Sequence, residues 1–132
     1  MISGSVTVTR PDLLGDAVSN PPTTKARGTT FSVTDTTRNG GTVASGASTT
    51  RYYLSLDGLK NAGDTLLTGS RAVPGLAAGA TSPPGTVTVT IPSTTPLNTY
   101  VLLACADDLN TVVETIETNN CKASAPGVTV TP

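Results

Sequence analysis

The sequence predicts a single all-β domain, and three observations support that prediction. Apolar and polar residues alternate with a period of two in several stretches, as they do in strands that bury one face. The 132-residue chain holds 13 Gly and 10 Pro, which interrupt helices and mark turns, and it is rich in the β-branched residue Thr. Its length suits one domain with a core of its own.

The alternating stretches define the strands in chain order. The stretch 29–37 places Phe31 and Val33 on one face and ends at the turn sequence Asn39-Gly40-Gly41. The stretch 49–56 is predicted to turn Tyr52, Leu54 and Leu56 inward, and the stretch 86–91 to turn Val87, Val89 and Ile91 inward. The seven expected strands are residues 13–18, 29–37, 49–56, 65–73, 86–91, 99–106 and 123–131.

Seven strands separated by turn sequences are typical of an immunoglobulin-like or fibronectin-III-like antiparallel β-sandwich. Tyr100 supports this fold class, because it follows a proline-containing loop at the start of a late strand. Such folds place a tyrosine corner there, with the hydroxyl group bonded back to nearby backbone. A tyrosine that only fills the core is the alternative.

The domain is expected to span residues 11–131. The first ten residues lack the charged segment and apolar core of a signal peptide, so we expect residues 1–10 to be a leader, a linker or an extra strand. The segment Val6-Thr7-Val8-Thr9 recurs as Val128-Thr129-Val130-Thr131, which suggests that residues 1–10 include the tail of a preceding repeat in a tandem array. The alternative is coincidence, since Val-Thr alternation also occurs at 87–90.

The two cysteines are predicted to form a disulfide bond. If Tyr100 points inward, Cys105 faces the other side of its strand, and Cys121 opens the next strand. Neighbouring antiparallel strands would bring the two thiols together, closing a loop of about 15 residues. Such a bridge implies an oxidising compartment. Two buried free thiols are the alternative.

An acidic and amide-rich segment between residues 107 and 120 is the candidate metal site. Ca²⁺ prefers six to eight oxygen ligands from carboxylates, amides and carbonyl groups. The segment offers Asp107, Asp108, Asn110, Glu114, Glu117, Asn119 and Asn120, and Asp57 with Asp64 forms a second oxygen cluster. The alternative is that these side chains cap turns and backbone groups.

Composition argues against catalysis and against several partners. The chain has no His, so it lacks the commonest general base and cannot build a Ser-His-Asp triad. A net charge of -1 gives no basic surface for nucleic acid, and no apolar run is long enough to cross a membrane. We therefore expect no enzyme, no nucleic-acid partner and no membrane insertion. Glu114 and Glu117 are a weak candidate for an acid–base pair.

The sequence resembles CARDB, the cell-adhesion-related domain found in bacteria. The resemblance runs from about Pro11 to Val130, and it rests on Pro11-Asp12-Leu13, the strand from Phe31 to Asn39, the segment 49–58, Gly63-Asp64 and the acidic ending. One departure is Ile116, which stands where relatives often carry Asn. The resemblance implies an immunoglobulin-like sandwich, often in tandem, on exported or cell-surface proteins, without catalytic activity of its own.

The expected function is a non-catalytic structural or adhesion module of a secreted or cell-surface protein. Its partners would be neighbouring domains, copies of itself, or a surface protein or glycan, and it requires no cofactor, with Ca²⁺ as the candidate stabilising ion. One alternative is a carbohydrate-binding accessory module of a secreted enzyme, with Tyr53 as the candidate stacking residue. Another is a filament subunit whose segment 6–9 adds a strand to the next copy.

Overall fold

The structure, a computed structural model, describes residues 10–110, 112, 120–124 and 126–132. Within this part every regular element is a strand. The strands are β1 (Leu13–Val18), β2 (Thr24–Ala26), β3 (Thr30–Asn39), β4 (Ser48–Ser55), β5 (Thr65–Val73), β6 (Gly85–Thr90), β7 (Thr99–Cys105), β8 (Cys121–Ala123) and β9 (Val128–Thr131). The described residues include no helix that is long and apolar enough to cross a membrane.

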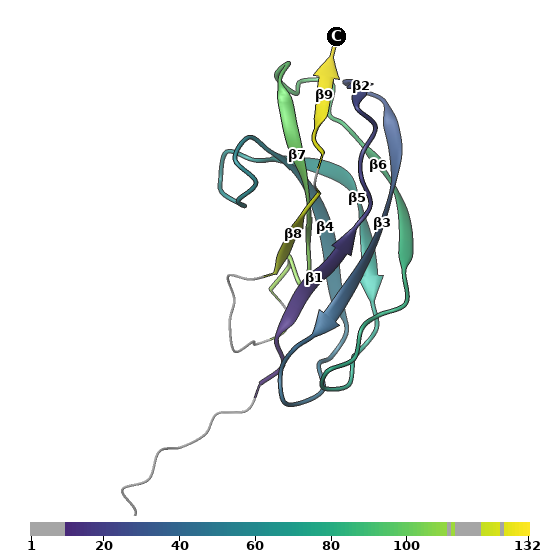
Figure 1. Cartoon of the computed structure of the whole chain (residues 1–132), viewed down its shortest axis with the longest axis vertical. Helices are drawn as coiled ribbons and strands as arrows, with labels where there is room; N and C mark the ends of the chain where they lie inside the picture. Colours follow the sequence, from purple (N-terminus) through teal and green to yellow (C-terminus); the bar gives the residue numbers. More distant parts are fainter. Residues whose placement is uncertain (1–9, 111, 113–119, 125) are drawn as a thin grey trace, which may run out of the picture.

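The strands form one sheet that curls until its two halves face each other (Figure 1). The strand order is β1-β3-β6-β5-β4-β7-β9-β2, and β8 pairs separately with β7. Strands β1, β3 and β6 make one half, and β5 joins them to the other half through the pair Thr68–Thr90. The result is the all-β sandwich-like fold that the sequence predicts.

The core lies between the two halves and follows the predicted alternation. It joins Phe31 and Val33 of β3 and Val89 of β6 to side chains of the opposite half. The opposite half contributes Tyr52, Leu54, Leu67, Tyr100, Leu102, Ala104, Val128 and Val130. On β4 and β7, the residues whose side chains point away from the core form a separate outer cluster of Tyr53, Leu103 and Cys105. Strand alternation therefore decides which residues enter the core.

Three details differ from the expected strand map. Strand β2 was not predicted, because three residues without a large apolar side chain carry no periodic pattern; it pairs in parallel with β9, an exception to the all-antiparallel prediction. The predicted strand 123–131 is two strands, β8 and β9, separated by a segment that contains Pro126. Leu56 is 66% exposed rather than inward, because β4 ends at Ser55, where a turn begins.

Tyr100 stands at the start of β7 with its ring in the core. Its hydroxyl donates to the carbonyl oxygen of Pro96 at 2.6 Å, which is the contact that defines a tyrosine corner. Burial raises the pKa of this hydroxyl. The contact joins the loop before β7 to the core, as immunoglobulin-like folds do at this position.

A buried ion pair, which the sequence did not predict, joins the two halves. Asp35 of β3 is 2% exposed, and its carboxylate accepts from Arg71 Nε of β5 at 3.1 Å and Nη2 at 3.2 Å. The Tyr52 hydroxyl of β4 donates to the same carboxylate at 2.6 Å. Burial, followed by this carboxylate, raises the pKa of Tyr52. The core therefore contains a polar network in which each charge has a partner.

Candidate functional site

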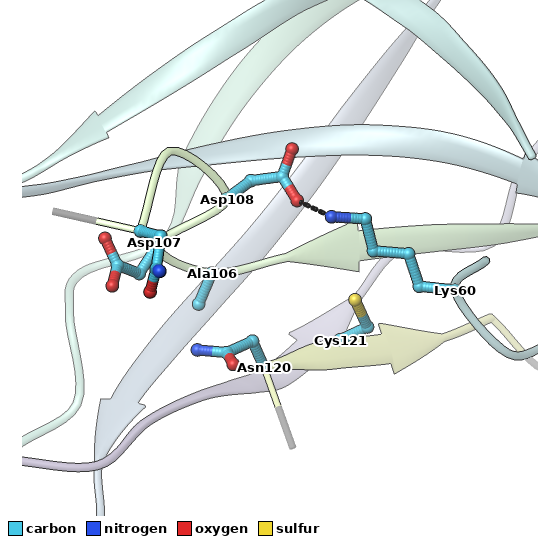
Figure 2. Close-up of a pocket in the computed structure, with 7 residues that line it drawn as sticks. Lys60, Ala106, Asp107, Asp108, Asn120 and Cys121 are labelled. Carbon is cyan, nitrogen blue, oxygen red and sulfur yellow. Dashed lines mark hydrogen bonds and ion pairs between the residues drawn. The ribbon is translucent and has the colours of Figure 1, made fainter. Parts of the chain in front are cut away.

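The candidate site is a hollow of about 350 Å³ at the end of β7, beside the start of β8. It is lined by Lys60, Ala106, Asp107, Asp108, Asn110, Asn120 and Cys121 (Figure 2). Four of the seven predicted metal ligands, Asp107, Asp108, Asn110 and Asn120, are therefore brought together here. The other three, Glu114, Glu117 and Asn119, lie outside the described residues.

The turn after β7 forms because its residues tolerate left-handed backbone. Asp107 has φ of 48° and Asn110 has φ of 54°, and Asp and Asn adopt this conformation more readily than most residues. The Asp107 carboxylate accepts from the Val112 amide at 3.1 Å, and the Asn110 amide donates to the Asp107 carbonyl at 2.8 Å. The Asp107 side chain thus caps the turn, which is the role that the sequence left as the alternative, and Asn110 contributes to the turn through its backbone.

Asp108 is the electrostatic centre of the site. Its side chain is 1% exposed, and it forms ion pairs with Arg51 Nε at 2.6 Å and with Lys60 Nζ at 2.5 Å (Figure 2 shows the second). The Tyr53 hydroxyl donates to the same oxygen as Arg51, at 2.5 Å. The Asp108 backbone amide also donates to the Thr49 carbonyl oxygen at 2.9 Å, which anchors the turn to β4. Two cations therefore neutralise this carboxylate.

The pKa values at the site reflect this pairing. Burial alone would raise the pKa of Asp108, but hydrogen bonds from Lys60, Tyr53 and Arg51 outweigh it and hold the pKa below the ordinary value. The bond to Asp108 raises the pKa of Arg51. Burial, followed by the same carboxylate, raises the pKa of Tyr53. Asp108 is therefore ionised, and Arg51 and Lys60 are charged, over the whole physiological pH range.

Tyr53 is not the exposed stacking residue that a carbohydrate-binding module requires. Its side chain is buried at 8% exposure, and the Lys60 ammonium group lies 4.9 Å from the ring centroid. Lys60 comes from the β4–β5 loop, which folds back over the outer face of the sheet to reach Asp108. Burial of the side chain, together with the Lys60 ammonium group over one face of the ring, leaves little of Tyr53 open for a sugar to stack on.

The disulfide bond lies beside this hollow. Cys105 and Cys121 are bonded, which confirms the predicted pairing and joins β7 to β8. Asn120, the residue before Cys121, adds hydrogen bonds to β1 and to the end of β7. Its carbonyl oxygen accepts from the Gly15 amide at 2.9 Å and from the Ala106 amide at 3.0 Å. The Asn120 side-chain amide also donates to the Leu13 carbonyl at 2.9 Å. Asn120 therefore joins β1 to β7 and β8.

The second oxygen cluster is a pair of turn-forming carboxylates. Asp57 accepts from the Ser55 hydroxyl at 2.8 Å and the Leu59 amide at 3.0 Å, and Asp64 accepts from the Asn61 amide at 3.0 Å. The Leu59 amide, followed by the Ser55 hydroxyl, lowers the pKa of Asp57. Both carboxylates thus shape the β4–β5 loop.

The arrangement is suited to holding chain segments together. Among the described residues, no group of three His, Cys, Asp or Glu side chains is placed to hold a metal ion. The Lys60 and Arg51 cations also stand beside Asp108, where their positive charges oppose the binding of a metal ion. Neither cation could be recognised from the sequence as a partner of Asp108, because 57 and 48 residues separate them from it in the chain.

The comparisons with known proteins agree with this fold and with the adhesion-related class. The sequence profile named CARDB matches residues 10–124 of the chain. The chain therefore belongs to the CARDB family. Among curated proteins, none matches this chain in sequence.

Solved structures show the same fold. The CARDB domain of the PF1109 protein from Pyrococcus furiosus, in complex with di-metal ions, has a TM-score of 0.60 and 22% identity, covering 97% of this chain and 95% of that chain. A domain of a protein assigned to the cell surface in Methanosarcina acetivorans has a TM-score of 0.58 and 23% identity, covering 90% and 92%. A β-glucosidase from Erythrobacter marinus has a TM-score of 0.54 and 12% identity, covering 92% of this chain and 16% of that chain.

Proposed function

We propose that this chain is a non-catalytic spacer module of an exported, cell-surface protein. Membership of the CARDB family supports the adhesion-related class. The absence of His and the mutual pairing of the charged groups at the hollow are consistent with a module without chemistry of its own. The disulfide bond supports an oxidising, extracytoplasmic compartment.

The observation that carries the spacer role is the position of the domain's two ends. Strand β1 starts toward the lower end of the long axis in Figure 1, and the C-terminus follows β9 at the upper end. A domain whose chain enters at one end and leaves at the other adds its length to a protein when it is placed in series. Neighbouring domains or further copies of this one are the partners that this geometry favours.

Small-angle scattering of one, two and three linked copies tests the spacer role. We expect the maximum dimension to grow by nearly equal steps, because each copy continues along the axis of the one before. Copies that fold back on one another, with a dimension that stays near that of a single domain, would contradict the proposal. Antibody labelling of intact cells, compared with lysed cells, tests the surface location independently.

Calcium stabilisation of the segment 107–120 is a further part of the proposal. The PF1109 domain is in complex with di-metal ions, which supports looking for a metal here. The described residues do not form such a site by themselves, since Asp108 is already neutralised by two cations. The proposal therefore depends on Glu114, Glu117 and Asn119.

The calcium proposal predicts that millimolar Ca²⁺ raises the melting temperature and that Glu117→Ala abolishes the rise. Thermal melts with added Ca²⁺ and with EDTA measure this effect. Asp16→Asn, which changes an exposed carboxylate on β1, is the matched control and should keep the response. Identical melts with Ca²⁺ and with EDTA would exclude calcium stabilisation.

A further inference from the structure

The two terminal strands lie along the direction in which a pull on the chain ends would act. In Figure 1, β1 points from the lower end of the long axis toward the middle, and β9 points toward the upper end. Hydrogen bonds in an antiparallel sheet run perpendicular to the strands, so a pull along a strand loads several of them together. A sideways pull would instead break them one at a time.

The first residues of β1 are held on two sides. On one side, Leu13 pairs with Asn39 and Gly15 pairs with Thr37 of β3. On the other side, the Gly15 amide donates to the Asn120 carbonyl, and the Leu13 carbonyl accepts from the Asn120 side chain, both at 2.9 Å. Leu13 is fully buried. These contacts lie where a pull from the N-terminal side would enter the domain.

The contacts at Asn120 lead directly into β7. Asn120 precedes Cys121, which is covalently bonded to Cys105 of β7, and the Ala106 amide donates to the Asn120 carbonyl at 3.0 Å. Strand β7 pairs with β4, β8 and β9, so force that reaches Cys105 is distributed over several strands.

The exit strand β9 is held by β7 and β2. Val128 pairs with Tyr100, and the Val130 amide donates to the Asn98 carbonyl at 2.9 Å. The side chains of Val128 and Val130 are buried in the core. A pull at the C-terminal side therefore acts along a strand with partners on both edges.

We propose that this domain bears tensile load and that the Cys105–Cys121 bond is the covalent step of its load path. By load path we mean the series β1, Asn120, Cys121, Cys105, β7 and β9. The biological use of this property rests on the proposed spacer function, because a spacer between a cell surface and a partner is the component that transmits tension. The mechanical property itself is a feature of the single domain.

Single-molecule pulling on the full chain, with handles at both ends, tests the proposal. Because 15 residues lie between the two cysteines, the oxidised domain should release about 5 nm less chain on unfolding than the reduced one. This difference verifies the redox state of each molecule. We expect the oxidised domain to unfold at a clearly higher force; equal forces in the two redox states would overturn the proposal.

Two variants separate the load path from general stability. Asn120→Ala removes the side-chain bond to Leu13, and we expect unfolding at constant force to become about threefold to tenfold faster. The matched control is Leu67→Ala, a core truncation on β5 outside the load path, which should lower the melting temperature more than Asn120→Ala does. For each variant, the acceleration of unfolding under force is compared with the loss of melting temperature. If Asn120→Ala accelerates unfolding no more, relative to its loss of melting temperature, than Leu67→Ala does, the load path is wrong.

The direction of pulling gives an independent check. With one handle moved to Ala62 in the β4–β5 loop and the other kept at the C-terminus, β1 is no longer loaded, and reduction should have little effect on the unfolding force. An equal effect in both directions would overturn the load path. None of these outcomes bears on the scattering test, so a mechanically weak domain would leave the spacer proposal standing.

Discussion

At the scale of single residues, two carboxylates with buried side chains are each held by an ion pair to an arginine. Asp108 and Asp35 are both nearly inaccessible, and each has an arginine partner. Removing one member of a buried pair leaves the other charge without compensation, which is more destabilising than losing an exposed pair. These carboxylates therefore contribute to stability in a way that substitution can measure.

Asp108→Asn should lower the free energy of unfolding at pH 7 by about 2 kcal/mol, less than for a fully buried pair because Arg51 and Lys60 are partly exposed. The pKa of Asp108 lies below its ordinary value of 3.8, so its stabilisation is present above that pH and is lost as the pH falls through the folded-state pKa. The difference between the two proteins should shrink below about pH 4. Urea unfolding across pH measures it, and a constant difference would contradict this account.

Arg71→Leu should lower the free energy of unfolding by about 3–5 kcal/mol, because it leaves the Asp35 carboxylate buried without its cation. Guanidinium unfolding at neutral pH measures the loss. Arg38→Leu, at an exposed position of β3, is the matched control and should change stability by less than about 0.5 kcal/mol. Equal losses in the two variants would show that the ion pair does not matter.

At the scale of elements, the contact between β1 and β8 depends on a glycine. A Cβ atom at Gly15 would lie 2.8 Å from the Lys122 Cβ and 2.9 Å from the Lys122 backbone nitrogen. The same residue lies at the register shift between β1 and β3. The missing side chain therefore lets β1 approach β8 closely enough for Asn120 to bond to it.

Gly15→Ala should lower the free energy of unfolding by about 1–3 kcal/mol, since backbone of β8 has to move to admit the methyl group. Gly46→Ala is the control, because a Cβ there meets nothing within 4 Å. Thermal or chemical unfolding of both variants measures the difference. If the two glycines respond alike, the close approach of β1 and β8 is not required for stability.

At the scale of the whole molecule, one core connects both halves of the sheet, so the domain should unfold as a unit. The main cluster draws side chains from β3, β4, β5, β6, β7 and β9. We expect far-UV and near-UV circular dichroism to report the same midpoint in guanidinium, as a two-state domain of this size does. Two separated midpoints would indicate that the halves unfold independently.

Local pattern was sufficient to predict most of the strands and their faces. Side chains alternate across a strand, so Tyr52 and Leu54 in the core and Tyr53 outside it follow from position alone. The pairing of Cys105 with Cys121 was predictable for a related reason, since the two residues lie on consecutive antiparallel strands. Strand β2 was missed because its pairing with β9 is a long-range contact that leaves no mark in three residues.

The sequence by itself determined the all-β class, the faces of the strands and the disulfide pair, because each depends on residues close together in the chain. Only the tertiary structure decided that Asp108 is neutralised by Arg51 and Lys60, that Asp35 pairs with Arg71, and that Asn120 joins β1 to β7. These contacts depend on the order in which strands pair across the sheet. Strand order is set by packing of the complete core, which no local pattern contains.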